Sequence, residues 1–203
     1  MDVHTRHTPW FGVARVVLSA GEAVRAEQRA MVATSFGVSV VPDGTAGRRA
    51  ANPPATFTAP AEGGWVDLAP EHPGDVYALE LPTTGGWCVT RDAVLVSPAT
   101  LRDDPLWSGF RQLFGAEPGF LRHVSGCGSL VLASGGPVEA FSLEAGEVVT
   151  IAPAYLLGYP DTVQCRLRAL DPAGPQSLRT GEGLVLDVAG PGTVLARTRR
   201  TAS

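Results

Sequence analysis

The chain of 203 residues contains few side chains of the types that bind metal ions. Its histidines are His4, His7, His72 and His123, and no two of them form the H-x-H pair typical of a metal site on a β strand. His4 and His7 lie in a terminus that we expect to be loose, which leaves two histidines in the body of the chain. We therefore predict that the protein holds no metal ion and no cofactor.

Cys127 is the side chain that most invites a catalytic interpretation. It lies within Ser125-Gly126-Cys127-Gly128-Ser129, where small neighbours could expose a nucleophilic thiol. A second copy of this pattern has Pro191 at the same position, so a turn is the favoured interpretation. Glu182 and its counterpart Glu117 are interpreted as solvated loop acids. With no G-x-S-x-G elbow for a serine hydrolase, we predict no catalytic residues and no enzymatic activity.

The aromatic residues Trp107, Phe110 and Phe114 form the most informative cluster. The segment 106–114 has helical spacing of its apolar residues, but Gly109 weakens this pattern and Gly115 would end it. We therefore predict a single helical turn within a loop. If the rings are exposed, they form an apolar patch suited to a protein partner or a membrane surface. If they are buried, they close one end of a β core. The sequence leaves both alternatives open and marks the cluster as a candidate interface.

The basic residues restrict function further, because all sixteen are arginine. A chain without lysine cannot have a Walker A phosphate loop or a Schiff-base lysine. The formal charge is −4 and the isoelectric point is about 5.5, so the chain is a poor binder of nucleic-acid phosphate. The cluster of Arg197, Arg199 and Arg200 is interpreted as a solvated tail, and we predict no nucleic-acid partner.

Cysteine usage and hydropathy indicate a compartment. Cys88, Cys127 and Cys165 are odd in number and widely spaced, which favours reduced thiols and a cytoplasmic location. The first ten residues have no apolar run of the kind found in signal peptides. No window approaches eighteen apolar residues, so we predict no transmembrane segment.

Most of the elements that would position these residues are predicted to be β strands. The clearest alternation of apolar and polar residues spans 162–170, and shorter β-rich runs span 75–81, 87–91 and 184–188. Residues 42–60, rich in Gly, Pro, Ala and Arg, are predicted to form a long exposed loop. The many glycines and prolines are spread along the chain, as in all-β proteins with frequent turns.

A repeat of about 64 residues organises these strands. Gly64, Gly128 and Gly192 stand 64 residues apart, and each opens a short apolar run. Gly126 and Gly190 precede the second and third by two residues, so each G-x-G is predicted to be a tight turn that needs a positive φ. We predict one strand before the turn and a returning strand after it.

The fold class expected from these patterns is all-β. We predict three tandem antiparallel β units packed around a pseudo-threefold axis as one sandwich-like or prism-like domain. Residues 1–11 would form an N-terminal extension, and residues 12–200 a single triplicated domain with units of about 12–75, 76–138 and 139–200. Residues 201–203 would form a short C-terminal tail.

Three segments, in order, make the sequence recognisable. The run 181–199 resembles the C-terminal signature of the altered-inheritance-of-mitochondria protein 24 family. Residues 21–32 are similar to its N-terminal signature, and residues 73–81 to its middle segment. The resemblance extends from about residue 12 to residue 199. The chain departs from the pattern where the aromatic stretch 107–114 replaces a glycine-rich segment.

The resemblance implies a fold shared with the tryptophan RNA-binding attenuator protein (TRAP), in three TRAP-like units, and a tendency to form homo-oligomers such as a trimer. It carries no catalytic residues to transfer, and bacterial members have no settled biochemical role. Mitochondrial relatives are associated with inner-membrane organisation. We therefore expect a non-catalytic oligomeric scaffold or protein-interaction module, with peripheral membrane association left open. A small-molecule binding module with a cleft between repeats and an unrecognised enzyme remain the alternatives.

Overall fold

The computed structural model describes residues 1–43, 53–117 and 119–200, and β strands predominate among them. The all-β class predicted from the sequence is thereby confirmed. The chain divides into two compact units, which we describe separately. Unit 1 consists of Met1–Leu81, Val94–Leu101 and Cys127–Pro137, and unit 2 of Pro82–Ala93, Arg102–Gly126 and Val138–Ser203.

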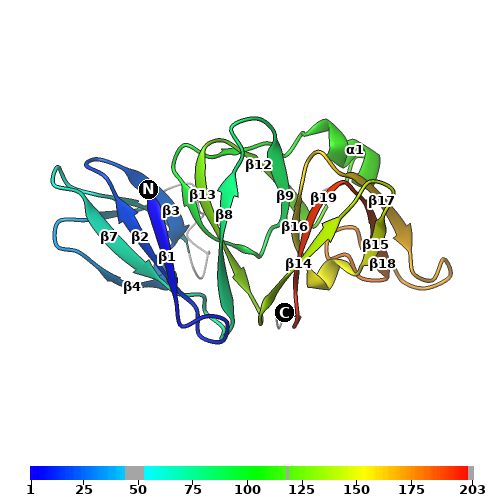
Figure 1. The fold of residues 1–203 in the computed structure, drawn as a ribbon, viewed down its shortest axis with the longest axis horizontal. Helices are drawn as coiled ribbons and strands as arrows, with labels where there is room; N and C mark the ends of the chain where they lie inside the picture. The colour runs from blue at the N-terminus through cyan, green and yellow to red at the C-terminus, as the bar shows by residue number, and fades with distance from the viewer. Residues whose placement is uncertain (44–52, 118, 201–203) are drawn as a thin grey trace. The chain divides into compact units, whose positions relative to one another are not determined.

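Unit 1 contains two antiparallel sheets (Figure 1). The first has the order β1-β2-β7-β4, formed by Asp2–Arg6, Val13–Leu18, Gly64–Leu68 and Met31–Thr34. The second has the order β5-β6-β3-β10-β13-β8, formed by Ser39–Pro42, Pro54–Thr58, Ala23–Glu27, Val94–Pro98, Gly128–Ser134 and Asp75–Leu81. A short 3-10 helix, η1 (Gln28–Ala30), links β3 to β4.

Alternation along the strands builds the core of unit 1. In β2, Ala14, Val16 and Leu18 are buried, whereas Val17 between them is exposed. In β6, Ala55 and Phe57 are buried in the same cluster. Full burial of a valine, leucine or phenylalanine side chain contributes about 1.5–3 kcal/mol. The cluster therefore supplies the main stabilisation of the two sheets in this unit.

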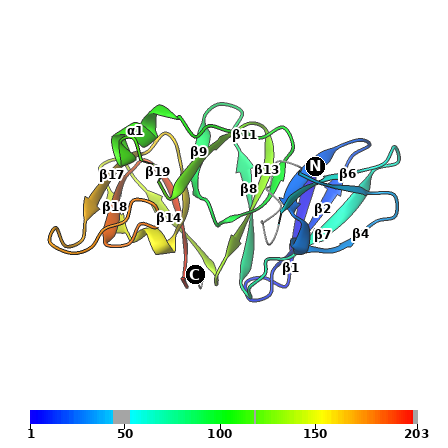
Figure 2. The same cartoon turned by 180° about the vertical axis from the view of Figure 1, so that it is seen from behind.

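Unit 2 also contains two antiparallel sheets (Figure 2). The six-stranded sheet has the order β11-β12-β9-β16-β19-β14, formed by Arg102–Asp103, Leu121–Ser125, Gly86–Thr90, Leu156–Pro160, Gly192–Arg197 and Val138–Leu143. The three-stranded sheet has the order β15-β18-β17, formed by Val148–Ile151, Leu184–Ala189 and Gln164–Ala169. Helix α1 (Ser108–Phe114) and the 3-10 helix η2 (Pro153–Tyr155) complete the unit.

The glycines at 64-residue spacing occupy equivalent places in the strand order. Gly64, Gly128 and Gly192 are the first residues of β7, β13 and β19. Each of these strands is the centre of a three-strand group, in the orders β2-β7-β4, β8-β13-β10 and β14-β19-β16. The predicted repeat itself stays a prediction. The arrangement of three units around a pseudo-threefold axis stays a prediction.

Three of the glycines at the predicted turns have a positive φ. Gly126, Gly128 and Gly192 have φ values of 142°, 111° and 154°, in the range that favours glycine. Gly64 and Gly190 are required for a different reason, which is close approach. A Cβ atom on Gly64 would lie 2.6 Å from Ser35 Oγ, and one on Gly190 would lie 2.4 Å from Glu144 O.

Two local predictions need correction. Residues 1–11 are not a loose extension, because β1 pairs with β2 over five residues from Asp2↔Val17 to Arg6↔Val13. The segment 42–60 is not one continuous loop, because Pro54–Thr58 forms β6 between β5 and β3. Residues 44–52 of the predicted loop lie outside the described residues. Within the described ranges, no helix has the length and hydropathy needed to cross a membrane.

Candidate functional site

Helix α1 brings the predicted aromatic cluster to the core of unit 2. Trp107 precedes the helix, and Gly115, with φ of 65°, follows it as the sequence predicts. Phe110 is 8% exposed and Phe114 is 4% exposed, and both pack in the buried cluster of this unit. Of the two alternatives left open by the sequence, burial applies to the two phenylalanines. An interface role stays a prediction for the half-buried Trp107.

The aromatic rings form a continuous series of contacts. Trp107 stacks on His123 with ring centroids 4.6 Å apart and an interplanar angle of 5°. Its ring also meets Phe110 edge to face at 5.2 Å. Gly109 makes this geometry possible, since a Cβ atom there would lie 2.1 Å from Trp107 Cζ3. The glycine that weakens the helical pattern in the sequence is therefore the residue that lets the indole lie across the helix.

His123 is held by a carboxylate as well as by the indole. Its Nε2 lies 2.9 Å from Asp161 Oδ2, and both side chains are largely buried. Cys88 lies opposite His123 on the neighbouring strand β9. A histidine paired with an aspartate can act as a general base if a nucleophile stands beside it. The thiols of this unit are Cys88 and Cys165.

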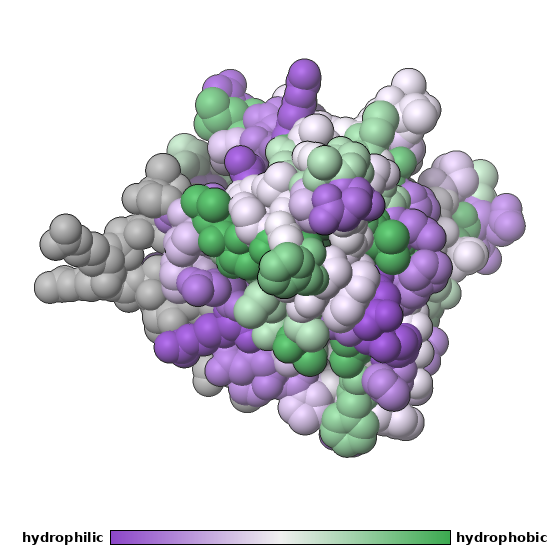
Figure 3. Space-filling model, turned by 90° about the vertical axis from the view of Figure 1, so that its left-hand side faces the viewer, coloured by the Kyte–Doolittle hydropathy of each residue, from purple (hydrophilic) through white to green (hydrophobic). Residues whose placement is uncertain are grey.

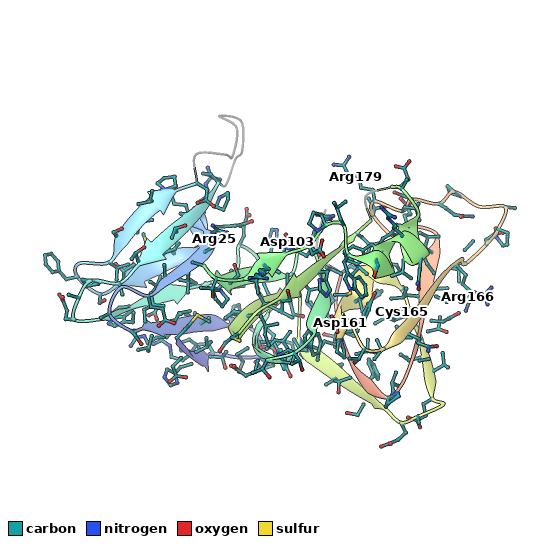
Figure 4. All side chains as sticks on the ribbon, turned by 90° about the horizontal axis from the view of Figure 1, so that it is seen from above. Arg25, Asp103, Asp161, Cys165, Arg166 and Arg179 are labelled. Carbon is teal, nitrogen blue, oxygen red and sulfur yellow. The ribbon has the colours of Figure 1, made fainter. Side chains whose placement is uncertain are left out.

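The thiols of unit 2 are not set up as nucleophiles. Burial raises the pKa of the Cys88 thiol far above its usual value, and burial raises the pKa of Cys165 to about 11. Burial likewise raises the pKa of the Tyr159 hydroxyl. Figure 4 labels Asp161 and Cys165 in this unit. Because a thiolate is the reactive form, Cys88 and Cys165 stay protonated and unreactive at neutral pH.

An apolar groove lies along α1. It has a volume of about 710 Å³, and Leu106, Trp107 and Phe110 contribute to its lining. Leu106 is 82% exposed, so it offers a largely accessible apolar side chain in the lining of the groove. Arg91, Arg111, Glu117 and Phe114 also line it. This arrangement can accept an apolar segment, with charged groups at hand to orient its ends.

A second cleft of about 870 Å³ in unit 2 is more polar. The charged side chains lining it are four arginines and two carboxylates, namely Arg91, Arg179, Arg197, Arg200, Asp92 and Glu182. Figure 4 shows Arg179 projecting from unit 2. Glu182 lines this cleft, whereas Glu117 lines the groove along α1. The two carboxylates compared in the sequence therefore lie at different sites.

Arg197 corrects the prediction of a solvated C-terminal arginine cluster. It lies in β19 and is only 3% exposed. Its guanidinium donates to Asp92 at 2.8 and 3.0 Å, to Thr90 Oγ1 at 2.9 Å and to Leu156 O at 3.3 Å. Arg199 and Arg200 are exposed, as expected. The strand pattern leading into residue 197 was the signal that this arginine is structural.

Asp67 is the buried carboxylate of unit 1, and the sequence patterns did not single it out. It lies in β7, opposite Arg15 on β2. Arg15 donates two hydrogen bonds of 2.8 Å to it, and Arg6 on β1 donates one of 2.7 Å. Arg15 also lies 4.0 Å above the ring of Trp65. The hydrogen bonds from Arg15, and then from Arg6, lower the pKa of Asp67.

The remaining histidines do not converge. His4 lies on the exposed strand β1 beside Asp2, with 3.0 Å between Nε2 and Oδ2. His72 lines a small hollow in unit 1 with Phe11 and Pro73. Across the described part of the chain, no three His, Cys, Asp or Glu side chains are grouped so that they could hold a metal ion.

The two-sheet units define an all-β protein with buried ion pairs at Asp67 and Arg197. The model of the family described as Mitochondrial biogenesis AIM24 matches residues 3–199. The chain belongs to this family.

One solved structure supports the same fold. It is an X-ray structure of a protein from Streptococcus pyogenes, with a TM-score of 0.74 and 21% sequence identity. The similarity covers 98% of this chain and 94% of the streptococcal chain. No curated protein matches the sequence.

Proposed function

We propose that the protein is a non-catalytic oligomeric scaffold, a protein-interaction module that assembles with copies of itself. The observation that carries this proposal is the apolar surface of β4 and the turn after it. Met31 is 40% exposed, Val32 is 60% exposed and Phe36 is fully exposed. Figure 3 views the end of unit 1 that carries β4 and β7, and apolar residues lie at its surface. Exposed large apolar side chains that gather on one part of a surface are typical of interaction sites.

The state of the titratable groups supports a non-catalytic role. Asp67 and Asp187 are each held by arginine on a neighbouring strand, and Arg197 is held by Asp92. These are the contacts of a fold-stabilising network. A catalytic site usually holds groups whose pKa values are shifted toward neutral pH and open to a substrate.

The family description links its members to mitochondrial biogenesis. For this chain we propose a cytoplasmic scaffold whose assemblies organise partner proteins, including partners at a membrane surface. The groove along α1 is the proposed partner-binding surface. Its apolar lining with Arg91, Arg111 and Glu117 suits an apolar segment flanked by charged residues.

The experiment is native mass spectrometry of the wild type and two valine variants. Val32→Arg places a charge on the exposed face of β4. Val41→Arg is the matched control, because Val41 is 58% exposed on another outer strand, β5. We expect a discrete oligomer for the wild type and for Val41→Arg, and a monomer of 21.1 kDa for Val32→Arg. A monomeric wild type would contradict the proposal.

The arginine-rich cleft favours a second candidate function, the binding of a small anionic molecule. Arg179, Arg197 and Arg200 line the cleft with Arg91, and such guanidinium groups suit carboxylates and phosphates. A thermal shift with inorganic phosphate and simple dicarboxylates tests it. We expect stabilisation that is lost in Arg179→Gln and kept in Arg166→Gln, which changes an exposed arginine outside the cleft. No shift with any anion would remove this candidate.

A further inference from the structure

Two outer strands lack the features that usually protect a sheet edge. Within the described residues, β4 pairs with β7 alone and β15 pairs with β18 alone. Their sequences, Met-Val-Ala-Thr in β4 and Val-Val-Thr-Ile in β15, contain no charge and no proline. An unprotected outer strand is a template for pairing with another strand.

The other six outer strands each carry protection. β5 ends in Pro42. The next residue, Asp43, donates its N–H to Pro54 O, toward β6. Because backbone groups alternate in direction along a strand, the nitrogen of Pro42 faces the open edge and offers no donor there. β1, β8, β11, β14 and β17 carry charged residues, namely Asp2, Arg6, Asp75, Glu80, Arg102, Asp103, Glu139, Arg166 and Arg168. The contrast singles out β4 and β15 as edges that remain open to a partner.

The internal joints of the fold show how such edges pair. Each six-stranded sheet consists of two three-strand groups joined by one antiparallel pair, β3 with β10 in unit 1 and β9 with β16 in unit 2. Ala26 lies opposite Val96 in the first joint, and Val89 lies opposite Gly158 in the second. Val96 and Gly158 each follow a one-residue register shift against the adjoining strand. The two joints therefore use the same register.

β4 and β15 have the same local features as the strands of these joints. β4 has its one-residue register shift against β7 between Met31 and Ala33, so Ala33 corresponds to Val96 and Gly158. β15 precedes η2 as β3 precedes η1, with Ile151 and Ala26 each two residues before the 3-10 helix. If β4 and β15 pair in the register that the two internal joints share, Ala33 lies opposite Ile151.

We propose that β15 of one copy of the chain pairs antiparallel with β4 of a second copy. The register places Ala33 opposite Ile151, Thr34 opposite Thr150 and Ser35 opposite Val149. This proposal rests on the proposed oligomeric scaffold and specifies its interface. The proposed partner is a second copy because, within the described residues, neither β4 nor β15 has a strand on its outer side, and each edge is complementary to the other. A joint that closed within one copy would instead leave the wild type monomeric.

The backbone directions agree with this register. Ser35 N–H donates to Trp65 O, so Ser35 directs its backbone groups toward β7. Glu147 O accepts from Gly190 N–H, so Glu147 and, by alternation, Val149 direct theirs toward β18. Thr34 and Thr150 therefore direct their N–H and C=O groups outward. In the proposed register these two residues face each other as a hydrogen-bonded pair.

One apolar side chain is exposed in β4 but buried at the corresponding position of β10 and β16. This difference is expected if β4 lacks the partner strand that β10 and β16 have. In each strand, one residue lies between the two paired residues that flank the register shift. In β10 this residue is Leu95, which is 6% exposed, and in β16 it is Leu157, which is fully buried. The corresponding residue of β4 is Val32, which is 60% exposed. On β15, the strand proposed to lie opposite β4, Val148 is 61% exposed. Pairing between copies would bring these apolar side chains to the interface.

The interface is heterologous, because β4 of one copy meets β15 of the next. Such head-to-tail contacts generate a ring when the rotation closes, and a filament when it does not. Each copy keeps one edge of each type, so assembly proceeds through one kind of contact.

The test uses proline to remove the outward N–H groups. Thr34→Pro blocks the β4 edge and Thr150→Pro blocks the β15 edge, while the inward hydrogen bonds to β7 and β18 remain. Each variant alone is expected to be a monomer of 21.1 kDa in native mass spectrometry. The two variants mixed in equal amounts are expected to form a one-to-one dimer of twice this mass, because each supplies the edge that the other lacks.

Ala169→Pro is the matched control. Ala169 is the last residue of the charged outer strand β17. The next residue, Leu170, donates its N–H inward to Gly183 O, so by alternation the N–H of Ala169 faces outward. This variant is expected to keep the mass of the wild-type assembly. A wild-type oligomer that persists in both Thr34→Pro and Thr150→Pro would overturn the proposed joint but leave the scaffold proposal standing. A monomeric wild type would overturn both.

Discussion

Replacing Asp67 with asparagine tests whether the buried carboxylate stabilises unit 1. Asp67→Asn keeps the size of the side chain and removes its charge. The hydrogen bonds from Arg15 and Arg6 then lose their ionic character. Because Asp67 is 6% exposed and lies in the strand between β2 and β4, water cannot replace these partners fully.

The expected loss of unfolding free energy in Asp67→Asn depends on how far Asp67 and its two arginine partners are buried. Hydrogen bonds to a charged group contribute about 1.5–3 kcal/mol. The Arg6 and Arg15 side chains are 42% and 34% exposed, so solvent screening reduces the expected loss to about 1–2 kcal/mol. For a chain of this length, each kcal/mol changes the melting temperature by about 2–4 °C, which gives a decrease of about 2–8 °C.

The assay is denaturant unfolding followed by circular dichroism between pH 7 and pH 3. The pKa of Asp67 is lower in the folded state than in the unfolded state. Its stabilisation is therefore fully present above the unfolded value of about 3.9 and is lost as the pH falls through the lower folded value. The difference between wild type and Asp67→Asn should hold from pH 7 to pH 5 and shrink at the acidic end.

Asp187→Asn is the matched control, because Asp187 is also paired with an arginine on the neighbouring strand but at an exposed site. It should cost less stability than Asp67→Asn. Equal stability of Asp67→Asn and wild type at pH 7 would refute the reasoning. So would a difference that stays constant from pH 5 down to pH 3.

Three further predictions concern other buried groups. Arg197→Met leaves the cleft without its buried guanidinium and should destabilise the fold by about 2–4 kcal/mol in denaturant unfolding, whereas Arg199→Gln at the exposed neighbouring site should be nearly neutral. Gly190→Ala should cost about 1–3 kcal/mol in the same measurement, because its Cβ would meet the backbone oxygen of Glu144. Thiol titration at pH 8 should label the exposed Cys127 quickly and Cys88 only after unfolding, because burial keeps that thiol protonated.

Local patterns predicted the elements whose signals are local. The alternation over 162–170 became β17, with bounds Gln164–Ala169. The glycines at 64, 128 and 192 became the first residues of three central strands. The apolar spacing over 106–114, predicted as a single helical turn, became the longer helix α1 of seven residues. In β17 and α1, the residues that define the element are close together in the sequence, whereas the three glycines were recognised by their regular spacing.

The contacts that the sequence did not predict join residues that are far apart. Arg197 and Asp92 are separated by 105 positions, and Arg15 and Asp67 by 52. The apolar run that opens at Gly192 indicates that Arg197 ends a strand, but nothing in the neighbouring sequence identifies Asp92 as its partner. The strand β16, Leu-Leu-Gly-Tyr-Pro, is almost wholly buried and therefore has no alternation to detect.

The candidate interface could be found only from the strand order. The sequence directed attention to Trp107, Phe110 and Phe114 because large aromatic side chains are conspicuous. The uncharged edges of β4 and β15 are ordinary short apolar runs until the pairing of all strands is known. Their significance comes from comparison with six protected edges and two internal joints.

The most direct measurement of the central claim is disulfide cross-linking across the proposed joint in a Cys127→Ser background. Ser35 and Val149 face each other as a non-hydrogen-bonded pair, whose Cα atoms are about 4.5 Å apart in an antiparallel sheet. Ser35→Cys combined with Val149→Cys should give disulfide-linked multimers on oxidation. Ser35→Cys combined with Thr150→Cys should not, because that thiol lies on the opposite face. Equal cross-linking of both pairs, or of neither, would contradict the joint between β4 and β15.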